Sequence, residues 1–148
     1  MAENTLKYHK EILELKLSVD CPPKNALTAD LEAFRWTFEK IDHNENFLPV
    51  AILNARKNRP PRINSKDESV ACSTLALSFF KSKEIAINKF KSLPDRNKEL
   101  LGYTHLSAGD LDSNDGLITM QSQSGHFDLH EFKKVDLSKK FKVLTRIE

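Results

Sequence analysis

The chain has 148 residues, a length typical of one domain, and its formal net charge is only +2. Apolar residues make up 39% of the sequence and charged residues 30%, which excludes wholesale disorder and predicts a folded core. So small a net charge argues against nucleic-acid binding driven by bulk electrostatics, and only four glycines argue against Gly-rich nucleotide loops.

Targeting signals and cysteines suggest where the protein works. No charged and then apolar leader follows Met1, and no apolar stretch approaches the roughly 20 residues needed to cross a bilayer. We therefore expect a cytoplasmic protein that contacts no membrane. Cys21 and Cys72 are far apart in the sequence, and Cys72 lies in the apolar run 70–77. Both cysteines are expected to be reduced, with Cys72 acting as a small buried hydrophobic residue.

The first part of the chain is predicted to be mainly helical. Apolar residues alternate over 13–19, which indicates a half-buried strand, although residues 7–17 could also begin as a helix. The clearest periodicity follows Thr28, a candidate N-cap, and it predicts a helix. Its apolar stripe consists of Leu27, Leu31, Phe34, Phe38 and Ile41. The apolar run 47–53 contains Pro49 and favours an edge strand or an extended segment.

The middle of the chain alternates between irregular and helical patterns. Residues 54–69 are basic, contain two prolines and lack apolar periodicity, so an exposed loop is expected. Residues 68–80 are predicted to form a buried helix, with a strand as the alternative. Ser82 fits the N-cap of a helix over 83–93, and residues 97–101 could add one more turn.

Beyond Gly102 the pattern is typical of β-structure. Short apolar segments over 103–106 and 117–120 flank an acidic loop that ends in Asp-Gly, and alternating runs follow over 126–132 and 141–147. The predicted fold class is therefore α+β. A helical N-terminal part would pack on a C-terminal antiparallel β-meander, in a single domain that spans the whole chain.

The run from His126 to His130 is the sharpest local pattern in the sequence. In a strand, His126, Asp128 and His130 project from one face, while the two apolar residues between them face the core. Imidazole and carboxylate groups suit Zn²⁺ or a similar ion, and His105 on a neighbouring strand is a candidate further ligand. The alternative interpretation is an amphipathic strand whose polar face lies in solvent.

Catalytic signatures are absent, because no serine lies in a G-x-S-x-G context and no phosphate-binding loop occurs. An arginine between aromatic residues (Arg35), a serine in an apolar run (Ser78) and a late acidic residue (Glu131) resemble the Arg, Ser and Glu order of ADP-ribosyltransferase-fold toxins. The resemblance implies a toxin or defence component that uses NAD. Arg35 would hold the NAD phosphates, Ser78 would shape the nicotinamide pocket, and Glu131 would stabilise the oxocarbenium-like transition state. Without the resemblance, the three residues are structural.

Basic residues form two further candidate surfaces. The loop residues that could contact nucleic-acid phosphates are Arg56, Lys57, Arg59 and Arg62. The lysine-rich strand at the C-terminal end could do the same. Alternatively its lysines lie in solvent, where they discourage association between sheet edges.

The function that the sequence favours is a small intracellular protein-binding module, accessory or regulatory, that acts through a partner protein. Trp36, the only tryptophan, and the nearby Phe34 are candidate anchors for that contact if they are exposed, and core residues if they are not. An ADP-ribosyltransferase-like or metal-dependent enzyme is the alternative, and nucleic-acid contact is the second alternative. A cofactor, NAD or Zn²⁺, is expected only if the protein is an enzyme.

Overall fold

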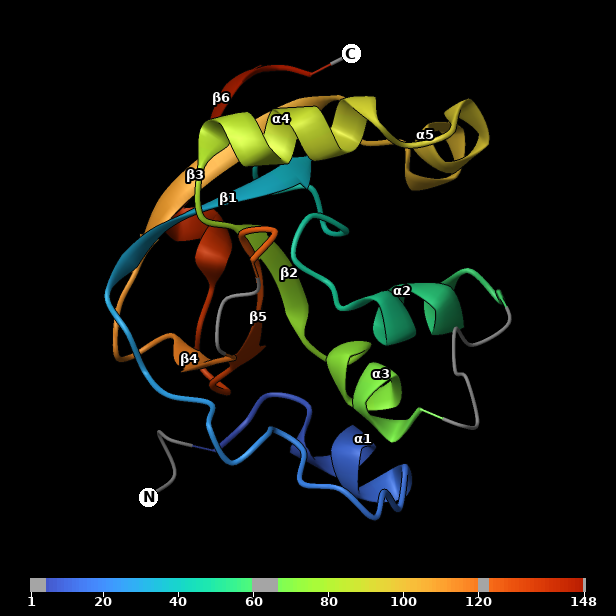
Figure 1. Cartoon of the computed structure of the whole chain (residues 1–148), viewed down its shortest axis with the longest axis vertical. Coiled ribbons are helices and arrows are strands. Elements are labelled where there is room, and N and C mark those ends of the chain that lie inside the picture. Colours follow the sequence, from blue (N-terminus) through green and yellow to red (C-terminus); the bar gives the residue numbers. More distant parts are fainter. Residues whose placement is uncertain (1–4, 60–66, 120–122, 148) are drawn as a thin grey trace.

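The computed structural model describes residues 5–59, 67–119 and 123–147, which form one six-stranded antiparallel sheet with five short α-helices around it (Figure 1). The elements follow the order α1 (His9–Glu14), β1 (Leu31–Thr37), α2 (Val50–Arg56), α3 (Glu68–Ser73), β2 (Leu77–Phe80), α4 (Lys83–Lys91), α5 (Asp95–Leu101), β3 (His105–Leu111), β4 (Gly116–Ile118), β5 (His126–Glu131), the 3₁₀-helix η2 (Leu137–Lys139) and β6 (Lys142–Arg146). The mixture of helices and strands confirms the predicted α+β class. Among the described residues, no helix has the length and hydropathy required to span a bilayer.

The strand order is β4-β5-β2-β1-β3-β6, which is not the predicted C-terminal meander. β1 and β2, from the first part of the chain, occupy the centre of the sheet. β1 pairs with β3 along its whole length, from Leu31 opposite Leu111 to Thr37 opposite His105. The local patterns identified several strands correctly, but alternation within a strand carries no information about which other strand will pair with it.

Each face of the sheet carries a buried apolar cluster. The face that we call the inner face is covered by the loop over 38–47 and by η2, and its cluster includes Leu77, Phe79, Leu111, Phe127 and Leu129. The opposite face, the α4 face, lies beneath α4, which crosses the sheet in Figure 1. Its cluster includes Phe34, Phe80, Ala86, Phe90 and Leu106. The sheet is therefore the middle layer of the molecule.

The helix expected over residues 27–41 is wrong, because this segment contains the central strand β1. Ala33 packs on the inner face, whereas Phe34 and Trp36 pack on the α4 face. A strand that is buried on both sides has no alternation of apolar and polar residues, so its sequence can imitate a helical stripe. Its aromatic residues favour the strand that is observed.

Other predictions in the first part of the chain also need correction. Residues 9–14 form α1, so the strand over 13–19 is wrong and the helical alternative holds. Residues 50–56 form α2 instead of an edge strand, with Pro49 just before the first helical residue, where a missing N–H costs nothing. The loop over 54–69 is helical at both ends, and residues 60–66, which include Arg62, lie outside the described residues. Residues 68–80 divide into α3 and β2.

Most of the individual helices and strands predicted after residue 80 are confirmed. The Ser82 hydroxyl accepts a hydrogen bond from the Ile85 N–H at 3.2 Å, which confirms it as the N-cap of α4. Residues 97–101 lie in α5, and Gly102 ends that helix with a positive φ of 74°. The four strands expected after Gly102 all contribute to the sheet, although Met120 lies outside the described residues.

The two cysteines form a disulfide, so the predicted free thiols are wrong. Their Cα atoms lie 5.6 Å apart although 51 residues separate them in the chain. In the chain-entropy treatment, closing a loop of this length stabilises the folded state by about 4 kcal/mol. The bond attaches the N-terminal segment to α3, and Ser18 reinforces the attachment by donating its hydroxyl to the Glu68 carboxylate at 2.6 Å. The separation in sequence gave no sign of this pairing.

The cap at Ser82 leads to a stability prediction. Replacing Ser82 by Ala leaves the Ile85 N–H without its acceptor and should lower the free energy of unfolding by about 1 kcal/mol. Urea unfolding followed by circular dichroism measures the change. Ser92→Ala is the matched control, because its exposed hydroxyl bonds only the Lys89 carbonyl within α4 and should cost less than about 0.5 kcal/mol. Equal losses in both variants would contradict the capping role.

Candidate functional site

Strand β5 presents His126, Asp128 and His130 on the α4 face, as alternation predicts. Phe127 and Leu129 are buried in the inner-face cluster, so His126, Asp128 and His130 point the other way. The His126 ring packs against Phe80, and its Nε2 atom lies 3.8 Å from the Asp128 Oδ1 atom. Burial raises the pKa of the Asp128 carboxyl from its ordinary 3.8 to about 6, whereas burial and the nearby Lys89 lower the pKa of His126.

His130 occupies a different environment from the other two polar residues of β5. Its side chain is only 3% exposed, and its Nε2 atom lies 3.9 Å from the Cys72 sulfur. Its other ring nitrogen, Nδ1, is buried without a hydrogen-bond partner. Burial lowers the pKa of His130 to about 4, so its imidazole is neutral near pH 7. A buried polar atom without a partner is uncommon and marks the position as a candidate site.

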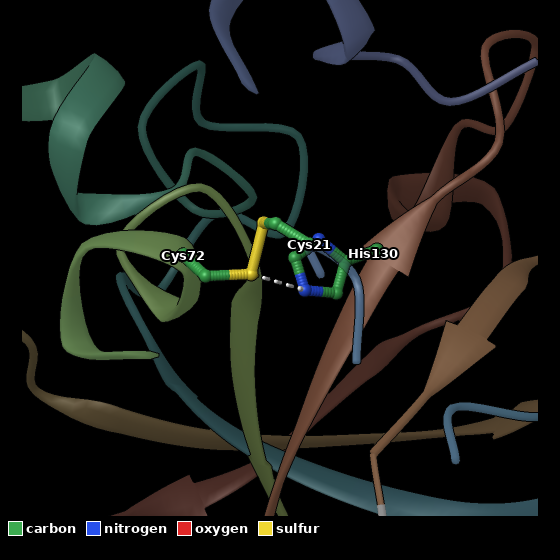
Figure 2. Close-up of side chains that lie close together, drawn as sticks. All are labelled: Cys21, Cys72 and His130. Carbon is green, nitrogen blue, oxygen red and sulfur yellow. Dashed lines mark hydrogen bonds between the residues drawn. A yellow bond between two sulfur atoms is a disulfide. The ribbon is translucent and has the colours of Figure 1, made fainter. Parts of the chain in front are cut away.

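The disulfide and His130 form one compact group of donor atoms (Figure 2). The sulfur atoms of Cys21 and Cys72 and a ring nitrogen of His130 all lie within 4.8 Å of one another. Among the described residues, this is the group of three or more His, Cys, Asp or Glu side chains whose spacing suits a metal ion. Sequence reasoning proposed His130 as a ligand but missed both cysteines, since they were treated as separate reduced residues.

The predicted metal ligand His105 lies far from β5. Three positions in the strand order separate β3 from β5, which corresponds to about 14 Å across the sheet. His105 also alternates with Leu106, a residue of the α4 face, so it points toward the inner face. It is buried, and its Nδ1 atom lies 2.7 Å from the Thr104 hydroxyl. The structure therefore does not bring His105 together with His126, Asp128 and His130.

Arg35 is buried at the centre of the inner face. Its Nε–H donates to the Asn46 carbonyl at 2.8 Å, and an Nη1–H donates to the Ser78 carbonyl at 2.7 Å. The guanidinium carbon lies 5.6 Å from the centre of the Phe79 ring and 6.0 Å from that of Phe47. Burial lowers the pKa of Arg35 from its ordinary value. These contacts engage the group that the toxin resemblance assigns to NAD phosphates.

The other two residues of the toxin-like set are placed differently from each other. Ser78 is exposed, and its backbone carbonyl accepts the hydrogen bond from Arg35. Its side chain points away from the inner face, because its neighbours Leu77 and Phe79 both point toward that face. Glu131 is 3% exposed and bonds Lys7 Nζ at 2.8 Å, but its Oε1 atom has no partner. Burial raises the pKa of Glu131, and Lys7 and then Arg35 oppose that rise. Arg35 and Glu131 thus share one side of the sheet, and the Ser78 hydroxyl lies on the other.

The candidate partner anchors lie beneath α4. Phe34 is 7% exposed in the α4-face cluster. The Trp36 indole N–H donates to the Ala86 carbonyl at 2.9 Å, and the ring lies 5.1 Å from Phe80 between centroids. Trp36 is only partly buried, but its hydrogen bond and ring contacts are made within the chain. Both residues act as core residues in this structure, which matches the alternative interpretation of the sequence.

Three of the candidate nucleic-acid residues are described, and they lie in exposed positions at the end of α2 and just after it. Arg56 ends α2, and Lys57 pairs with the Glu45 carboxylate at 2.9 Å. Arg59 is exposed, and Arg62 lies outside the described residues.

Strand β6 forms one edge of the sheet. β6 stands at the end of the strand order and pairs with β3, and no other strand among the described residues pairs with it. Lys142 and Arg146 are exposed along this edge, and Leu144 between them is 48% exposed. A hollow of about 370 Å³ adjoins the end of β6, with Phe90, Tyr103 and Ile147 in its lining.

Comparisons with known protein families, with curated proteins and with solved structures find no match to this chain. Its candidate sites are therefore interpreted from their geometry.

The buried contacts of Arg35 lead to a stability prediction. Replacing Arg35 by Ala leaves the Asn46 and Ser78 carbonyls without donors and should lower the free energy of unfolding by about 3 kcal/mol. Arg35→Lys, the matched control, keeps a charge but offers no planar fork for two separate acceptors, so it should recover only part of the loss. Denaturant unfolding measures both. An Ala variant as stable as the wild type would contradict this role.

Asp128 should make stability depend on pH. The folded state binds its proton at about pH 6, and the unfolded chain only near 3.8, so the contribution of Asp128 to the free energy of unfolding rises as pH falls from about 7 to about 4. Asp128→Asn should remove this component. Urea unfolding at several pH values measures the slope for both proteins, and identical slopes would contradict the assignment. Glu45→Gln is the control, since the pKa of Glu45 is lowered and its contribution changes in the opposite direction.

Proposed function

We propose that the chain is a small accessory or regulatory module that binds an extended, acidic segment of a partner protein along β6. The observation that supports this proposal is the open edge of β6. A strand at a sheet edge presents backbone N–H and C=O groups to which a further strand can add. The proposed contact thus uses the backbone for affinity and the exposed side chains of β6 for choice of partner.

The opposite edge of the sheet offers no such opening. Leu27 forms an isolated antiparallel bridge with Ile118 of β4, and the two residues exchange N–H to carbonyl bonds of 2.9 and 2.7 Å. β4 also has only three residues, whereas β6 has five. The N-terminal segment therefore covers one edge, and the proposed partner would cover the other.

The charge on β6 argues for an acidic partner. Lys142 and Arg146 are both cationic and exposed, so an acidic strand would gain cross-strand ion pairs with them. A second copy of β6 would instead place like charges opposite each other, which disfavours self-pairing. Leu144, between the two cations, supplies apolar surface for the same contact. The register of β6 shifts opposite Leu106 and Ser107, so Lys142 lies opposite Ala108 on the α4 face and Arg146 lies opposite His105 on the inner face. A partner strand that alternates acidic and apolar residues directs its acidic side chains to one of these two cations.

The adjacent hollow extends the proposed surface beyond β6. It is open beside the end of the strand, where the Ile147 N–H bonds the Thr104 carbonyl at 3.0 Å. Phe90, Tyr103 and Ile147 give it apolar walls, and Leu100 and Leu101 of the neighbouring α5 are 55% and 36% exposed. An apolar side chain of the bound segment could enter the hollow.

Nucleic acid is the competing ligand for a basic edge. Phosphates would contact Lys142 and Arg146, but they would leave the outward N–H and C=O groups of β6 to solvent. A polypeptide satisfies both the charges and the backbone groups. The proposal therefore favours a protein partner and makes nucleic acid an outcome of the test.

A designed peptide tests the proposal. The probe is an eight-residue peptide that alternates Glu and Val, with blocked termini, and its matched control has Lys in place of Glu. At low salt the acidic peptide should slow hydrogen exchange of β6 amides, and the control should not. The double variant Lys142→Glu/Arg146→Glu should weaken binding of the acidic peptide roughly fivefold to tenfold, as measured by fluorescence anisotropy.

Matched controls separate the edge from general charge. Lys133→Glu/Lys134→Glu changes the net charge equally at two exposed positions outside β6, and it should leave the affinity nearly unchanged. Equal binding of both peptides, or exchange protection outside β6 alone, would contradict the proposal. Tight binding of a single-stranded oligonucleotide without protection of β6 amides would also contradict it, in favour of nucleic acid.

A further inference from the structure

The buried end of the disulfide lies against an imidazole that has little other bonding. Cys72 is 3% exposed on α3, and His130 is 3% exposed on β5. The Nε2 atom of His130 contacts the Cys72 sulfur at 3.9 Å, and its Nδ1 atom has no partner (Figure 2). A neutral imidazole and two sulfur atoms thus share one water-poor site.

The placement of the three residues is fixed by separate parts of the fold. His130 pairs with Leu117 of β4, and Cys72 lies near the end of a helix that Asp67 caps. Cys21 belongs to the N-terminal segment and is the more exposed of the two cysteines. A small thiol in solution would therefore reach the Cys21 sulfur first, whereas Cys72 and His130 form the less accessible side of the site.

We propose that Cys21, Cys72 and His130 form a redox-gated metal site, closed while the disulfide is intact and able to bind one Zn²⁺ ion after a thiol reductant opens it. The inference is independent of the proposed contact along β6. Its basis is the donor set: all three donor atoms lie within 4.8 Å of one another, which is compatible with an ion bonded to sulfur at about 2.3 Å and to nitrogen at about 2.0 Å after small shifts.

The opening step follows ordinary thiol–disulfide exchange. A thiolate attacks the more exposed Cys21 sulfur, the S–S bond breaks, and Cys72 leaves as a thiolate that takes a proton from solvent. A second thiolate attacks the mixed disulfide and releases Cys21, so two thiols are oxidised to one disulfide. Binding of Zn²⁺ then displaces the two thiol protons into solvent and leaves two thiolate ligands.

The chemistry of the donors selects the class of metal. Thiolate and imidazole groups favour Zn²⁺ and similar soft or borderline ions, whereas Mg²⁺ and Ca²⁺ require oxygen ligands. No Asp or Glu among the described residues belongs to this group of three. Three protein ligands leave the fourth tetrahedral position for solvent or a small ligand.

Cobalt provides a spectroscopic test of the site. The chain is reduced with dithiothreitol, desalted without oxygen and titrated with Co²⁺, whose thiolate bonds give near-ultraviolet charge-transfer absorption. We expect one Co²⁺ per chain, displaced by Zn²⁺, and no such absorption with the oxidised protein. His130→Ala should weaken Co²⁺ binding roughly tenfold to hundredfold and shift the visible bands, since a ligand of the metal is lost.

The matched control is His126→Ala, which removes a histidine from the same face of the same strand but outside the group of three. It should leave the affinity and the spectrum unchanged. His130→Gln is a second variant in case the alanine variant fails to fold, and circular dichroism checks each reduced protein. The inference is overturned if the reduced wild type binds no Co²⁺, if it binds only after losing its fold, or if the His130 and His126 variants behave alike.

Discussion

The arrangement of the inner face depends on one buried cation. The guanidinium of Arg35 on the central strand β1 bonds the carbonyl of Asn46 in the covering loop and the carbonyl of Ser78 in the neighbouring strand. Asn46 is itself fully buried, and its side chain bonds the backbone of Phe38, Lys40 and Ile41, so it holds the loop closed. The buried charge is accommodated because the Nε–H and an Nη1–H of the guanidinium each donate to a carbonyl. Two aromatic rings also lie near the guanidinium carbon. Sheet and loop are therefore positioned by the same side chain.

Sequence patterns predicted part of this fold, and the failures have a common cause. β5 was identified correctly because Phe127 and Leu129 face the core while the residues between them are polar. β1 was mistaken for a helix because Phe34 and Trp36 are covered by α4 while Ala33 is covered on the other side, which removes the alternation. A local sequence pattern identifies a strand that is buried on one face, but it often fails for a strand that is buried on both faces. Local patterns also could not predict the strand order, because β1 pairs with β3, which lies far from it in the sequence.

The candidate site shows the same limit at the level of single side chains. His105, His126 and His130 are equivalent in a sequence that offers only residue type and spacing, yet the fold gives each a different neighbour. His105 lies beside the Thr104 hydroxyl, His126 beside Phe80 and Asp128, and His130 beside a disulfide. Alternation predicted the face of His130 correctly. It could not predict that Cys21 and Cys72 converge there, because that requires α3 and the N-terminal segment to meet.

The bond between Cys21 and Cys72 also determines which parts of the chain are covalently enclosed. The 51-residue separation forms a closed ring that contains β1 and α2, while β2 and everything after it lie outside the ring. A protease that cuts one peptide bond between the two cysteines therefore opens the ring without releasing a fragment. The two pieces stay attached through sulfur and run as one species on a gel until a reductant separates them. A cut after Cys72 leaves two pieces that no disulfide joins. A denaturing gel without reductant therefore distinguishes a cut between the two cysteines from a cut after Cys72.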